Sequence, residues 1–199
     1  MNYTIKKVKI KDRSLTVDMN EIVTGENGSF TNEVTKKCAN LAHDDLLKSF
    51  DGLVPHLISI CDFKGSEDIN RENIEVGMSD IFSDYEVTGF SIGGADEKEG
   101  VVLIAQRSFP SGKVLNIVTP FTQYLDEDYE FGSELSAAIE NCLFETKEYL
   151  FNDKFCFKQL EMDFNDEHPE GDKAVEELMK PLKEKIKKSK SKKVAEEAA

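Results

Sequence analysis

Hydrophobic and polar residues alternate most clearly between Tyr85 and Thr119. Three segments rich in Val and Ile, residues 85–92, 101–107 and 114–119, are separated by short connections that contain glycine or proline. A period of two residues is typical of strands, and short Gly- or Pro-containing connections are typical of hairpins. The pattern therefore predicts a three-stranded antiparallel meander over this part of the chain.

The same period predicts a hairpin near the N-terminus, with strands over residues 3–11 and 14–23. In the second strand apolar and polar residues alternate without interruption, whereas in the first the apolar positions change face near Lys6 and Lys7. A β-bulge at that point would explain the change. The first strand carries four lysines, which predicts an edge strand, because charge on an edge prevents the addition of further strands.

A helical spacing of apolar residues begins after the loop at residues 25–29. Thr31 is the expected N-cap, and apolar residues follow at positions 34, 38, 41, 46, 50 and 53. Pro55 lies inside this pattern, so it should kink the helix or start a second one.

A second helix is expected between Ser133 and Leu150. Ser133 can act as its N-cap, and the acidic run Asp126–Glu130 precedes it, where negative charge favours a helix N-terminus. Its apolar residues repeat at helical spacing and predict one buried face. Residues 64–83 match no period.

These elements predict an α+β fold with an antiparallel sheet of five or six strands and two main helices packed on one face. Residues 154–164 alternate like a last strand, so residues 1–164 are expected to form a single compact domain. Residues 165–199 are charged, poor in apolar residues and interrupted by Gly and Pro. This composition is typical of a mobile tail.

The formal net charge is −14, and residues 165–199 carry nine acidic and nine basic residues, so the excess lies in residues 1–164. An acidic body repels nucleic-acid phosphates unless its basic residues are clustered. One such cluster lies in the tail and could hold single-stranded DNA. The alternative is a solubilising disordered end. The cluster consists of Lys183, Lys185, Lys187, Lys188, Lys190, Lys192 and Lys193.

The four cysteines lie far apart and form no Cys-x-x-Cys pair. Three of them fall on apolar faces of the expected helices, which predicts reduced thiols in a cytoplasmic protein. The first residues lack the apolar core of a signal peptide, and no apolar run is long enough to span a bilayer. The sequence thus predicts a cytoplasmic protein that does not bind membranes.

Two groups of residues invite a catalytic or metal-binding interpretation. Asp126–Glu130 resembles the start of a calcium loop, but the sixth and twelfth positions hold Phe131 and Ala137 in place of Gly and Glu. His43 precedes two aspartates, but no third group follows at a recognised metal or catalytic spacing. We expect His43 to lie at the surface or at its boundary. The sequence predicts no catalytic, cofactor-binding or metal-binding residue, and no enzyme.

A short segment near the end of the expected domain, Gln159–Phe164, carries a partner-binding hypothesis. Gln159, Leu160, Met162 and Phe164 resemble the short peptide by which bacterial DNA-metabolism proteins dock on the sliding clamp. In the alternative interpretation, the segment is a last strand that buries the same apolar side chains in the core of this protein.

A wider resemblance rests on Val87–Gly94, Gly100–Ile104 and Gly112–Phe121, together with Tyr149–Phe151 and Gln159–Phe164. These segments resemble short accessory proteins of bacteriophages and prophages, to which no activity is assigned. The resemblance implies an intracellular accessory protein of a mobile element, in a bacterial host.

We therefore expect a non-catalytic accessory protein of phage-type DNA replication or recombination. Its partner would be a protein such as a sliding clamp or another replication protein, with single-stranded DNA as a second ligand. The alternative is a protein–protein interaction or structural module, such as an inhibitor of a host factor or a component of an oligomeric assembly.

Overall fold

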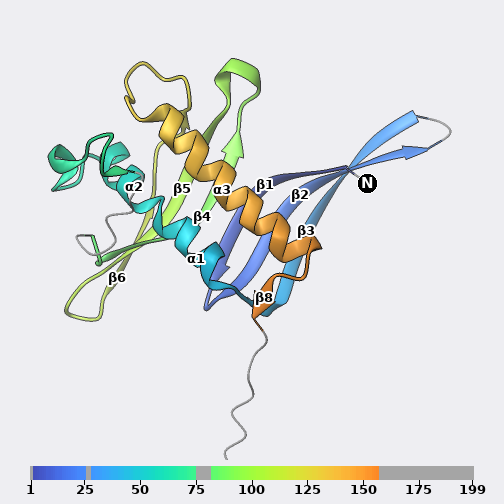
Figure 1. The fold of residues 1–199 in the computed structure, drawn as a ribbon, viewed down its shortest axis with the longest axis horizontal. Helices are drawn as coiled ribbons and strands as arrows, with labels where there is room; N and C mark the ends of the chain where they lie inside the picture. The colour runs from blue at the N-terminus through green and yellow to red at the C-terminus, as the bar shows by residue number, and fades with distance from the viewer. Residues whose placement is uncertain (1, 26–27, 75–81, 157–199) are drawn as a thin grey trace, which may run out of the picture. The chain divides into compact units, whose positions relative to one another are not determined.

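A computed structural model describes residues 2–25, 28–74 and 82–156 of the chain (Figure 1). The strands are β1 (Asn2–Lys11), β2 (Ser14–Gly25), β3 (Gly28–Ala42), β4 (Tyr85–Gly93), β5 (Gly100–Ser108), β6 (Val114–Val118), β7 (Thr122–Gln123) and β8 (Phe155–Cys156). The helices are α1 (Asp44–Asp51), α2 (Val54–Ile60) and α3 (Gly132–Phe151), with short 3-10 turns at Ser66–Asp68 and Asp96–Lys98.

The strands form one antiparallel sheet in the order β6-β5-β4-β1-β2-β3-β8, and β7 pairs with β5. The expected meander is β4–β5–β6, and the expected N-terminal hairpin is β1–β2. The two are joined where β1 pairs with β4, in a register that sets Val8 opposite Phe90. The predicted α+β class and antiparallel sheet are confirmed, but the prediction of five or six strands was too small.

Helices α1 and α3 lie side by side across one face of this sheet (Figure 1). The apolar strand residues that face them are buried together with the inner faces of the helices. Phe90, at the centre of the sheet, is fully buried and its ring packs against that of Phe50 in α1. Among the described helices, none is both long and apolar enough to cross a membrane.

The irregularity predicted in β1 is confirmed, because the pairing with β2 shifts register between Ile5 and Lys7. The predicted edge position of this strand was wrong, since β1 pairs with β2 on one side and β4 on the other. The lysines in this strand have a different cause. Lys9 follows the buried Val8, so its side chain lies on the other face of the sheet, beside Thr16 of β2. No described helix covers that face.

The helix predicted from Thr31 was wrong over its first part, because residues 28–42 form strand β3. Positions four residues apart, such as Val34 and Cys38, share a face in a helix and also in a strand, so their spacing could not separate the two. The helix begins only at Asp44. Of the two alternatives predicted for Pro55, a kink or the start of a second helix, the second is confirmed: Pro55 lies in the first turn of α2.

The second predicted helix is confirmed as α3, but Ser133 is not its N-cap. The N-cap is Phe131, which makes no side-chain cap, and the Ser133 hydroxyl donates to the Glu134 carboxylate. Glycine is required at the first residue of α3, because the chain passes close to Tyr124 there and a Cβ on residue 132 would overlap the Tyr124 carbonyl oxygen.

Candidate functional site

His43 was expected at the surface or at its boundary, but it is buried: only 7% of its surface is exposed. It is the N-cap of α1, and its Nδ1 accepts a hydrogen bond from the backbone N–H of Leu46 at 3.1 Å. A side chain that accepts from this N–H satisfies one of the unpaired donors at the start of a helix. The two aspartates after His43 occupy the first turn, where the helix dipole favours negative charge.

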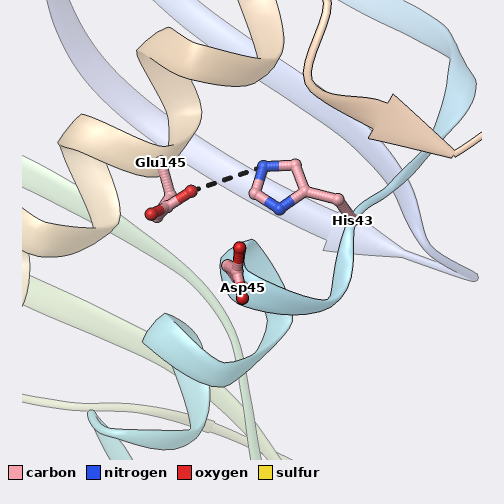
Figure 2. Close-up of side chains that lie close together, drawn as sticks. All are labelled: His43, Asp45 and Glu145. Atoms are coloured by element: carbon pink, nitrogen blue, oxygen red, sulfur yellow. Dashed lines mark ion pairs between the residues drawn. The ribbon is translucent and has the colours of Figure 1, made fainter.

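The cap brings His43 next to an ion-pair cluster made by residues far apart in the sequence. The carboxylate of Glu145, on α3, lies 3.5 Å from His43 Nε2 (Figure 2). The ammonium of Lys154 lies 2.7 Å from the same Glu145 oxygen and 2.9 Å from Asp45 Oδ2. Hydrogen bonds from Lys154 lower the pKa of Asp45, and its bonds to Glu145 and Asp45 raise the pKa of Lys154. The cluster connects α1, α3 and the segment before β8.

A metal ion could in principle use this cluster, since His43, Asp45 and Glu145 each offer one ligand atom, all within 4.8 Å of one another. His43 Nε2 is also buried without a well-formed hydrogen bond among the described residues. However, Nδ1 accepts the Leu46 N–H, so the proton of the neutral ring is on Nε2, which then presents a donor and no lone pair to a metal. The Lys154 ammonium already lies between the two carboxylates. We interpret the cluster as structural.

The second buried histidine, His56, is likewise structural. Its Nδ1 lies 2.8 Å from the Tyr129 hydroxyl, which ties the loop before α3 to α2. Burial lowers the pKa of His56 to about 4, although the nearby Glu134 carboxylate opposes this shift. The ring is therefore neutral at pH 7.

The other feature that could have a function is the edge of the sheet at β6. The Phe109 N–H donates to the Lys113 carbonyl at 2.9 Å, and the Thr119 N–H donates to the Leu103 carbonyl at 3.0 Å. In an antiparallel pair, residues alternate between those that bond the neighbouring strand and those that do not. The odd-numbered residues of β6 therefore bond β5, and Val114, Asn116 and Val118 point their N–H and C=O groups away from the sheet. Among the described residues, β6 pairs with β5 alone.

Side chains along this edge are apolar and exposed. Val114 is 54%, Leu115 50% and Val118 67% exposed, and only Ile117 of the strand's apolar residues is buried. The register places Val118 beside Ile104 on the uncovered face and Leu115 beside Arg107 on the helix-covered face. An edge strand with no charge and no proline lacks the features that usually prevent strand addition.

Charge is distributed unusually around β6. The chain has 39 acidic residues in 199, but residues 100–125 contain none, and their charged residues are Arg107 and Lys113. The β6 edge is thus an apolar and weakly basic strip on an acidic protein.

Arg107 lies at the end of this strip in a distinctive environment. Its guanidinium lies 4.9 Å from the ring centroid of Tyr85 and 5.1 Å from that of Phe109, and Tyr85 in turn stacks on Phe63. The Nε atom is buried without a hydrogen-bond partner, and none of the side-chain hydrogen bonds and ion pairs of the described residues involves the Arg107 guanidinium. The rings of Tyr85 and Phe109 therefore hold the guanidinium in place, while its Nε donor has no acceptor among the described residues.

The partner-binding residues predicted from the sequence, Gln159, Leu160, Met162 and Phe164, lie outside the described residues, as do the lysines of residues 183–193. Sequence reasoning missed the β6 edge and Arg107. The absence of acidic residues over 100–125, in a chain this acidic, was the signal that could have identified them.

No protein-family model, curated protein or solved structure matches this chain.

Proposed function

We propose that this chain is a non-catalytic protein-interaction module that binds an extended segment of another protein by adding it to the β6 edge. The observation that carries the proposal is the outward alignment of the N–H and C=O groups of Val114, Asn116 and Val118 on an edge without charge or proline. In this mode of recognition the main-chain hydrogen bonds supply affinity, and pockets for alternate side chains supply specificity.

The side chains beside the edge support the same function. A strand added to β6 would lie next to Val114 and Val118 on one face and Leu115 on the other, all of them at least half exposed in the free chain. Burying apolar area contributes roughly 25 cal/mol per Å². An added strand with apolar residues on both faces would therefore gain affinity beyond its backbone hydrogen bonds.

A second copy of the chain is a poorer occupant than a different protein. Antiparallel pairing of β6 with β6 of another copy would bring the Arg107 and Lys113 residues of both copies to one interface, and residues 100–125 provide no acidic residue to compensate them. Both copies also carry a net charge of −14. We propose a heterologous partner for this reason, and the native mass of the purified chain tests it.

Selection from a displayed library of random nine-residue peptides tests the function on the full chain. The decisive variant is Asn116→Pro, which removes one outward N–H and introduces a ring on the open side, a position where edge strands tolerate proline. Asn116→Thr is the matched control, because it keeps the N–H. We expect wild type and Asn116→Thr to enrich the same alternating apolar peptides and Asn116→Pro to enrich none. Equal enrichment on Asn116→Pro would contradict the proposal.

A second candidate function, binding of single-stranded DNA, is favoured by one observation. Strand pairing places Lys9, Thr16 and Lys37 in one row on the uncovered sheet face, with Lys7 opposite Asp18 in the next row, and no ion pair of the described residues involves these lysines. Replacing all three lysines with Gln should reduce the slope of log affinity against log salt by about 2, at about 0.7 per lost phosphate contact. An unchanged slope would refute a role for this face.

The setting in phage-type DNA replication or recombination, with a sliding clamp or another replication protein as partner, also remains a proposal. It is supported by the resemblances described for the sequence. Its proposed docking segment, Gln159–Phe164, lies outside the described residues. A pull-down with a purified clamp, using wild type and Leu160→Ala/Phe164→Ala, tests this setting independently of β6.

A further inference from the structure

We propose that Arg107 recognises a carboxylate side chain, Asp or Glu, on the strand that binds to β6. This inference rests on the proposed strand-addition function and specifies the chemistry of the partner: an extended segment with apolar residues and an acidic residue beside the Leu115 end of the edge.

The first argument is the preorganisation of Arg107. The rings of Tyr85 and Phe109 hold its guanidinium at 4.9 and 5.1 Å, so the side chain loses little freedom when it binds a ligand. Arginine also presents its donors as a planar fork that matches a carboxylate in a bidentate geometry.

The second argument is that Arg107 lacks an acceptor. An arginine that is partly buried normally satisfies its donors, because an unpaired buried polar group is costly. Here Nε is buried without a partner, and the hydrogen bonds and ion pairs of the described residues do not include this side chain. An acceptor from a bound partner would complete the site.

Three acidic residues line the same hollow as Arg107: Glu67, Asp68 and Asp84, together with the basic Lys64. None of these carboxylates lies within ion-pairing distance of Arg107. They make this side of the hollow unfavourable for a second carboxylate, so the acidic residue of the partner is expected to approach from the β6 side, where residues 100–125 contain no acid.

The sheet geometry permits that approach. Arg107 is paired with Leu115 on the helix-covered face, and a strand added beyond β6 would place one of its residues next to Leu115. Neighbouring strands are about 4.8 Å apart, so this residue would lie roughly 10 Å from the Arg107 Cα. A glutamate at this position can extend over Leu115 toward the guanidinium while Arg107 keeps its contacts with Tyr85 and Phe109.

The test is a double-mutant cycle with peptides selected on wild type and capped at both ends, so that a side-chain carboxylate is their only acidic group. Each peptide is compared with its Glu→Gln or Asp→Asn analogue on wild type and on Arg107→Gln. Charge-assisted hydrogen bonds are strong enough that we expect wild type to prefer the acidic peptide roughly tenfold or more. On Arg107→Gln the preference should disappear, while the amide analogue binds both proteins equally and thereby shows that the variant is folded. Arg107→Lys keeps the charge without the fork and should retain a smaller preference.

The outcomes distinguish a failure of the Arg107 inference from a failure of the proposed strand addition at β6. Selected peptides that bind β6 but show no preference for the acid, or a preference that persists in Arg107→Gln, would overturn the role of Arg107 and leave strand addition intact. Acid-dependent binding that Asn116→Pro does not weaken would show that Arg107 recognises an anion away from the edge, which would overturn the inference and the proposed function together.

Discussion

Lowering the pH should destabilise this protein through His56. The buried ring is neutral in the folded state, where its pKa is about 4, whereas an exposed histidine in the unfolded chain has a pKa of about 6.5. Between these two values the unfolded state binds more protons, so the stability that the neutral ring contributes is lost as the pH falls. Integrating the linkage relation from pH 7 to pH 5 gives a loss of about 2 kcal/mol from this residue.

Denaturant unfolding at pH 7, 6 and 5 measures the effect, with His56→Gln as the reference variant. Glutamine is uncharged throughout, so the difference in unfolding free energy between the two proteins cancels the titration of carboxylates that do not interact with His56. We expect this difference to change by about 2 kcal/mol in the direction that disfavours wild type at pH 5. A difference that is constant with pH, or a folded-state His56 titration near 6.5 by NMR, would refute the reasoning.

Two further changes test the packing. Lys154→Met leaves the largely buried Glu145 carboxylate without its cation and should cost about 1–3 kcal/mol. Lys147→Met, on an exposed position of α3, should change stability by less than about 0.5 kcal/mol, and equal effects would show that the cluster is not stabilising. Gly89→Ala should cost about 1–3 kcal/mol, because its Cβ would lie 2.7 Å from a carbonyl oxygen of β1. Gly93→Ala meets its nearest atom at 3.4 Å and should cost clearly less in the same thermal-unfolding assay.

Local patterns in the sequence predicted the elements whose periods are unambiguous. The β4–β6 meander and α3 follow from strict alternation and from helical spacing. The β3 error arose where both periods agree, since Val34 and Cys38 satisfy either one. Neighbouring Thr31 and Thr35, which are β-branched and favour strands, were the local signal that a helix assignment overlooked.

Long-range pairing was not predictable in the same way. The lysines of β1 indicate an exposed face, and only the pairing of β1 with β4 shows that this face belongs to the centre of the sheet. Likewise, the contact between Lys154 and Asp45 joins residues far apart in the chain. The burial and capping role of His43 could not be predicted, because they depend on α1 beginning at Asp44, which makes this histidine the N-cap.

Hydrogen exchange at single β6 amides in the free chain tests the central claim, the open edge, most directly. The N–H groups of Val114, Asn116 and Val118 point away from the sheet, so they should exchange rapidly, while those of Leu115 and Ile117, bonded to β5, should be protected. Addition of a selected peptide should then protect the first three. Protection of all five amides in the free chain would show that the edge is already covered, and would contradict the account.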